Sequence, residues 1–66
     1  MDHITSDFYE ILPLGKGLAD VYLYPPGEPI RVVRGVPEEA ATEENVRRFF
    51  YRWVEIGEIL RKGVEE

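Results

Sequence analysis

The chain has 66 residues, no cysteine, and 13 acidic against 8 basic side chains, which gives a formal net charge of −5. The lack of cysteine excludes a disulfide framework, a thiolate metal site and a thiol nucleophile. The acidic balance argues against free nucleic acid and anionic membranes as partners. No apolar run approaches the roughly 18 residues of a membrane span, and the first seven residues do not resemble a signal peptide. We therefore expect a soluble, cytoplasmic protein.

The length predicts one small domain over residues 1–66. A domain of this size buries only about 60% of the surface that its unfolded chain exposes, so a partner could add useful burial. The content of aromatic and β-branched residues is that of a folding chain. We expect a flexible N terminus (1–6), a β-meander (8–34), a helical region (37–62) and a frayed tail (63–66).

Three apolar runs at residues 8–14, 18–24 and 30–34 predict a three-stranded antiparallel meander. The Gly-Lys-Gly segment at 15–17 suits a tight hairpin, because glycine accepts a positive φ. Pro26 and Gly27 suit the two central positions of a type II turn. Such short connections permit only antiparallel pairing. Pro13 should hold the first strand at an edge of the sheet, since proline has no N–H to donate.

The C-terminal part predicts one long amphipathic helix. Pro37 suits a first helical position and Thr42 an N-cap, so we expect a short helical turn and then a main helix from Glu43 to about Lys62. Whether the two pieces join is left open. Apolar residues recur along one stripe at Val46, Phe49, Phe50, Trp53, Ile56, Gly57 and Leu60. This stripe should pack on one sheet face, which makes the expected fold α+β with the order βββα.

Strand alternation predicts which side of the sheet the helix covers. Ala19, Val21 and Leu23 point to one side of the second strand, and this small aliphatic set suits packing under the helix. The other side would stay uncovered, and tyrosine and arginine are the residue types that dominate protein interfaces. The candidate residues of this uncovered face are Tyr22, Tyr24, Arg31 and Val33.

A second candidate contact lies on the helix. A helix of about 20 residues spans about 30 Å, whereas strands of five to seven residues span about 17–23 Å. One end of the helix should therefore overhang the sheet. Tyr51 and Ile59 lie outside the apolar stripe, so the overhang could pair with a second copy of the chain or dock on another protein.

Residues suited to catalysis or metal binding are scarce. The hydroxyls of Thr5, Ser6 and Thr42 and the single histidine, His3, do not supply a nucleophile, a base and an orienting group. His3 with a free N-terminal amine could bind Cu(II) or Ni(II), but any chain with histidine in third place has this property. The Gly-Lys-Gly segment lacks the spacing of a phosphate-binding loop. We predict no catalytic residues, no cofactor and no metal site.

The sequence favours a non-enzymatic protein-binding module whose partner is another protein or its own copy. By analogy, small acidic proteins of this kind serve as accessory regulators or inhibitors, including in phages and mobile elements. Three alternatives stay open. The acids could imitate a nucleic-acid backbone on one contiguous face, the chain could be a homodimeric structural subunit, or mid-chain arginines could form a nucleic-acid patch. These arginines are Arg31, Arg34, Arg47, Arg48 and Arg52.

Overall fold

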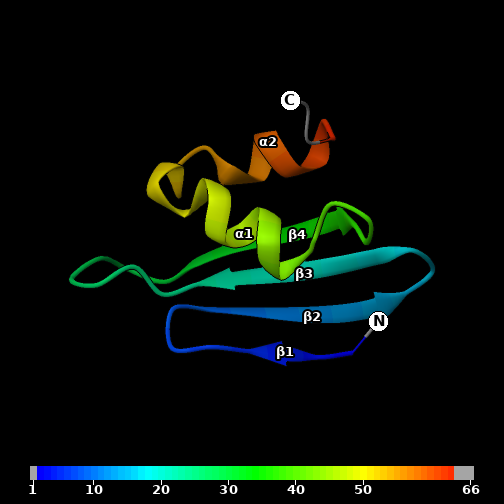
Figure 1. The fold of residues 1–66 in the computed structure, drawn as a ribbon, viewed down its shortest axis with the longest axis horizontal. Helices are drawn as coiled ribbons and strands as arrows, with labels where there is room; N and C mark the ends of the chain where they lie inside the picture. Colours follow the sequence, from blue (N-terminus) through cyan, green and yellow to red (C-terminus); the bar gives the residue numbers. More distant parts are fainter. Residues whose placement is uncertain (1, 64–66) are drawn as a thin grey trace.

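A computed structural model describes residues 2–63, which form a four-stranded antiparallel sheet with two short helices on one face (Figure 1). The predicted α+β class and the antiparallel pairing are confirmed. Within these residues neither helix is long and apolar enough to cross a bilayer. In chain order the elements are β1 (Ile4–Thr5), β2 (Tyr9–Gly15), β3 (Leu18–Leu23), β4 (Arg31–Pro37), α1 (Glu43–Phe49), the 3-10 turn η1 (Phe50–Arg52) and α2 (Ile56–Arg61).

The prediction of three strands is wrong, because the N-terminal segment adds a fourth. The two residues of β1 pair with Glu10 and Ile11 of β2. The amide of Ser6 then donates to the carbonyl of Tyr9 at 2.9 Å and closes the connection. Residues 2–6 are therefore partly tied to the sheet and not a free terminus. Met1 and residues 64–66 of the predicted tail lie outside the described residues.

Both predicted turns are confirmed. Lys16 and Gly17 join β2 to β3 with φ angles of 61° and 80°, the signature of a two-residue type I′ hairpin. In the β3–β4 loop, the amide of Glu28 donates to the carbonyl of Pro25 at 3.1 Å, and Gly27 has a φ of 75°. In a type II turn the first central residue, here Pro26, has a negative φ and the second, here Gly27, has a positive φ.

Pro13 marks the point where β2 becomes an edge. The described pairing of β1 stops at Glu10 and Ile11, so β2 is interior there and unpaired beyond. Backbone groups of odd-numbered β2 residues point toward β1, because Tyr9 accepts from the β1 side. The missing N–H of Pro13 therefore faces the unpaired side. β2 is therefore an edge strand at Pro13, as predicted, but at Ile11 it has a neighbouring strand on both sides.

The prediction of one long helix is also wrong. The helix ends at Phe49, whose φ of −107° and ψ of 12° leave the helical region, and η1 and a turn follow before α2 begins after Glu55. A straight helix of about 30 Å would overhang strands of about 23 Å. The break lets α2 return across the sheet and pack on β4, where Ile56 and Leu60 are fully buried.

The ends of the helical region follow their local signals. The Oγ1 of Thr42 accepts from the amide of Asn45 at 3.2 Å, which confirms the N-cap. Residues 38–40 form a turn and not a helix, with the amide of Ala40 donating to the carbonyl of Pro37 at 2.9 Å. Gly63 follows α2 with a φ of 87°, as a C-terminal glycine does.

A single core lies between the sheet and the helices. Ala19, Val21 and Leu23 are completely buried on the helix side, as predicted. Val33 is only 2% exposed and pairs with Val21, and Arg31 pairs with Leu23. The register therefore places both residues on this same side and not on the uncovered face, where they were predicted. The largest fully buried side chains are Ile11, Leu23, Ile56, Leu60, Val21, Val36 and Val46.

Candidate functional site

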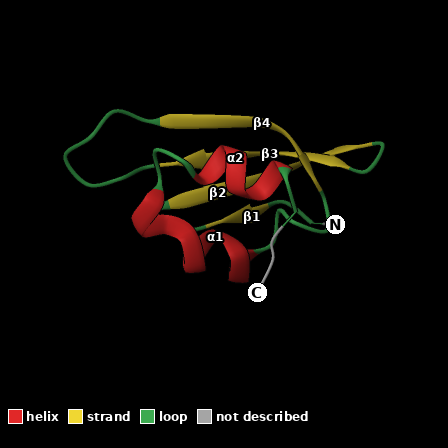
Figure 2. Ribbon diagram, turned by 90° about the horizontal axis from the view of Figure 1, so that it is seen from above, coloured by secondary structure: helices red, strands yellow, loops and turns green. Residues whose placement is uncertain are grey.

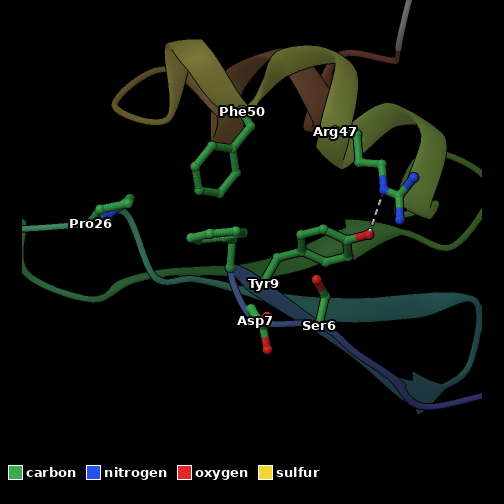
Figure 3. A pocket seen from close by; sticks show the side chains of 7 residues that line it. Ser6, Asp7, Tyr9, Pro26, Arg47 and Phe50 are labelled. Carbon is green, nitrogen blue, oxygen red and sulfur yellow. Dashed lines mark hydrogen bonds between the residues drawn. The ribbon is translucent and has the colours of Figure 1, made fainter.

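Three segments that are distant in sequence meet at one end of the sheet and form an open groove of about 560 Å³ (Figure 3). They are the β1–β2 connection, the β3–β4 loop and the junction of α1 with η1. Most of the groove surface is apolar. The lining residues are Ser6, Asp7, Phe8, Tyr9, Pro26, Arg47 and Phe50.

Two phenylalanines form the apolar wall of the groove. The ring of Phe8 contacts the ring of Phe50 edge to face, with centroids 6.3 Å apart and planes at 65°. Phe50 reaches down from the helical layer, and Pro26 stands on the loop beside it (Figure 3). Phe8 nevertheless remains 50% exposed. An aromatic ring that is held in place but half in water is suited to contact an apolar group of another molecule.

A buried tyrosine fixes the polar wall. The hydroxyl of Tyr9 donates to Glu43 Oε2 at 2.6 Å and accepts from Arg47 Nε at 2.9 Å, the dashed line of Figure 3. Hydrogen bonding to Tyr9, with the nearby Glu43 carboxylate, raises the pKa of the Arg47 guanidinium above its usual range. The groove is thus bounded by a permanent, oriented cation whose charge is partly balanced by Glu43.

The helix break adds exposed apolar surface next to this groove. Phe50 is followed directly by Tyr51, which is 78% exposed, and Val54 in the next turn is exposed as well. Tyr51 was expected on a helix overhang, and it lies instead at the break. Ile59 is partly buried in α2 and does not line the groove.

The uncovered face carries both predicted tyrosines, and Tyr24 is part of a polar cluster there. The hydroxyl of Tyr24 donates to Glu10 Oε1 at 2.9 Å, and His3 Nε2 lies 2.5 Å from Glu10 Oε2. The hydrogen bond from Tyr24 is the main cause that lowers the pKa of Glu10, and the bond from His3 is the next. The Tyr24–Glu10 bond also raises the pKa of Tyr24. Tyr22 pairs with Val32 across the strands, and both tyrosines are half-buried.

Strand β4 forms the edge of the sheet opposite β1 (Figure 2). The register with β3 shifts at Asp20, a buried carboxylate on the uncovered face. Asp20 accepts from the amide of Gly35 at 3.2 Å and from Arg34 Nη1 at 3.3 Å. Gly35 has a φ of 69°, so a β-bulge capped by Asp20 ends the regular part of this edge.

The charged side chains are distributed over several elements. Of the mid-chain arginines, Arg34, Arg47 and Arg52 each contact a carboxylate. The carboxylates involved come from β3, α1 and the turn before α2. Each of these three arginines is therefore partly neutralised by a neighbouring carboxylate.

No family model matches the sequence, and no curated protein or solved structure matches it at a significant level. The groove residues Phe8, Pro26 and Phe50 were not predicted as a site. Each looked like part of a strand, a turn or the helix stripe, and only the fold brings them together.

Proposed function

We propose that the chain is a cytoplasmic, non-enzymatic protein-binding module, an accessory regulator or inhibitor that acts by contact with another protein. The observation that carries this proposal is the half-exposed Phe8 packed against Phe50 in an apolar groove. Buried interface centres are depleted in charge and enriched in aromatic residues. A partner that fills the groove would bury Phe8 without rearranging the fold.

The neighbouring helix break supports the same assignment. Tyr51 and Val54 are both exposed, and they follow the groove residue Phe50 closely in the chain. Tyrosine at such a position supplies a large contact area at low conformational cost. Arg47, held by Tyr9, would orient polar groups at the rim of the interface.

A hydrolytic role finds no support in the arrangement of the few candidate groups. His3 is engaged with Glu10 on the uncovered side of the sheet, whereas Ser6 lines the groove on the helix side. A nucleophile and its base must lie within hydrogen-bond reach of each other. We therefore assign the Ser6 hydroxyl no catalytic role.

The test is affinity capture from host extract with three tagged proteins: wild type, Phe8→Ser and Leu14→Ser. Leu14 is a matched control, because it is also 50% exposed but lies outside the groove, before the β2–β3 turn. We expect one specific partner with wild type and Leu14→Ser and its loss with Phe8→Ser. Circular dichroism must first show that both variants are folded.

Two results would contradict the proposal. Equal capture by all three proteins would place the interface elsewhere, and a Tyr22→Ala/Tyr24→Ala variant would then test the uncovered face. If none of them captures a partner, sedimentation equilibrium of the purified chain decides on self-association. A dimer that Phe8→Ser dissociates would favour the homodimeric structural subunit.

A further inference from the structure

The free edge of β4 is a second surface with the geometry to bind a partner. β4 is the outermost strand of the sheet, and within the described residues no element lies beyond it (Figure 2). An exposed edge presents backbone N–H and C=O groups that another strand can pair with. This surface is separate from the groove, none of whose lining residues belongs to β4.

The hydrogen-bond pattern fixes which groups of β4 are available. The amide of Tyr24 donates to Phe8, so even-numbered residues of β3 bond toward β2 and odd-numbered residues toward β4. Leu23 and Val21, which pair with Arg31 and Val33, therefore use the inward groups of β4. The N–H and C=O of Val32 point outward, and Val32 is also among the exposed apolar side chains.

Arginine side chains surround this edge. Arg61 of α2 crosses to β4 and donates from Nε to the carbonyl oxygen of Arg34 at 3.2 Å, which holds its guanidinium beside this strand. Arg31 begins the strand, is exposed, and has no ion-pair partner among residues 2–63. Arg34 is partly neutralised by Asp20, so Arg31 and Arg61 supply most of the free positive charge.

This charge decides between two possible strands at the edge. A second copy of the chain pairing β4 with β4 would bring Arg31 and Arg34 of both copies onto one ribbon, and like charges on facing strands are destabilising. Positive side chains at an edge commonly prevent such self-pairing. The same charges attract an acidic strand, because charge complementarity speeds and selects the encounter.

We propose that β4 binds an extended acidic segment of a partner protein, which adds as a fifth strand beside residues 31–34. The segment pairs with the outward amide and carbonyl of Val32, and its acidic side chains lie against Arg31 and Arg61. This mode of strand addition takes its affinity from the backbone and its selectivity from side chains. The inference rests on the proposed function only in that the partner is a protein.

The probe is an acetylated and amidated heptapeptide of alternating glutamate and valine, with a lysine–valine peptide as the control. The full-length ¹⁵N-labelled chain is titrated with each peptide and followed by amide chemical shifts and hydrogen exchange. We expect the glutamate peptide to shift the amides of β4 and to slow exchange at Val32 by about tenfold or more. The lysine peptide should leave both unchanged.

Two variants test the mechanism separately. Val32→Pro removes the outward N–H without removing a bond to β3, so it should abolish binding of the glutamate peptide. Arg31→Glu should weaken binding about threefold to tenfold, the effect of reversing one exposed charge. Lys16→Glu makes the same change in net charge at the β2–β3 turn and should leave the affinity within about twofold. Amide spectra establish that each variant is folded.

Several results would overturn this inference. They are shifts outside β4, equal binding of the lysine peptide, an unchanged affinity for Arg31→Glu, or no binding at millimolar peptide. Concentration-dependent shifts of β4 without peptide would show that a second copy is the occupant. None of these results changes the capture of a partner protein by the groove around Phe8. Loss of the groove interface likewise leaves the peptide titration unchanged. The two proposals can therefore fail independently.

Discussion

The hydroxyl of Tyr9 donates to Glu43 Oε2 at 2.6 Å and thereby ties the start of β2 to the first turn of α1, 34 residues further along the chain. The same hydroxyl accepts from Arg47, so one buried oxygen joins the sheet to two turns of the helix. This contact sets the position of α1 over the groove. Glu43 lies in the first turn of α1, where its negative charge interacts favourably with the positive end of the helix dipole.

Replacing Tyr9 by phenylalanine should lower the free energy of unfolding by about 1–2 kcal/mol, because Glu43 and Arg47 lose a shared partner beside the core. Urea unfolding followed by circular dichroism measures the change. Tyr22→Phe is the control, since the Tyr22 hydroxyl has no hydrogen-bond partner among residues 2–63. Equal stability of Tyr9→Phe and wild type would show that the hydroxyl does not hold α1 on the sheet.

The Glu10–Tyr24 pair predicts a pH window for stability. The pKa of the Glu10 carboxyl is lowered from its ordinary value of 4.5, so its contribution to stability is present above pH 4.5 and is lost as the pH falls through the lowered pKa. The pKa of Tyr24 is above 10.0, so its contribution is present below pH 10.0 and is lost as the pH rises through the raised value. Tyr24→Phe should therefore be less stable than wild type at neutral pH.

The measurement compares the urea midpoints of wild type and Tyr24→Phe between pH 3 and pH 11. The difference should be largest across the middle of this range and should shrink at both ends. Carbon-detected NMR titration should also place the Glu10 carboxyl below its ordinary pKa in wild type and closer to it in the variant. A midpoint difference that does not vary with pH would refute the linkage.

Asp20→Ala should destabilise the chain by about 1–3 kcal/mol, because the amide of Gly35 loses its acceptor at a partly buried bulge. Asp20→Asn keeps a carbonyl oxygen for this amide but loses the charge that faces Arg34. It should therefore cost less than Asp20→Ala. Thermal or urea unfolding ranks the two variants, and the reverse order would argue against the bulge cap.

Gly57→Ala should lower stability by about 1 kcal/mol even though alanine favours a helix over glycine. A Cβ at this position would lie 3.3 Å from Val33 Cγ1, and the buried, β-branched Val33 has little room to yield. In a Val33→Ala background the same change should be neutral or stabilising. A double-mutant cycle with urea unfolding measures this coupling. Equal costs in both backgrounds would exclude the contact as the cause.

Local signals in the sequence predicted the parts of the fold that local chemistry decides. The positive φ angles at Gly17 and Gly27 and the cap at Thr42 depend on residues within a few positions of each other. The same holds for the alternation that buries Val21 and Leu23. These features were predictable because each has a physical cause confined to its own segment.

The errors arose where distant packing decides the outcome. The apolar stripe from Val46 to Leu60 fits one continuous helix. The strands are too short to cover the full length of such a helix, and the helix ends at Phe49. β1 has only two residues, too few for a pattern of alternation. The prediction put Arg31 and Val33 on the wrong side, because the β3–β4 register cannot be derived without the loop and the bulge. The groove could not be predicted either, because it forms only when the β1–β2 connection, the β3–β4 loop and the α1–η1 junction are brought together.

Because β1, β2, β3 and β4 lie in the sheet in the order in which they occur in the chain, each strand pairs only with its neighbours in sequence. The entropy lost on closing each loop is then small, and folding rates rise as contacts become more local. The two-residue turn at Lys16 and Gly17 gives the β2–β3 hairpin the shortest loop to close. We expect this hairpin to nucleate folding within milliseconds of synthesis or dilution from denaturant, with β1 joining last.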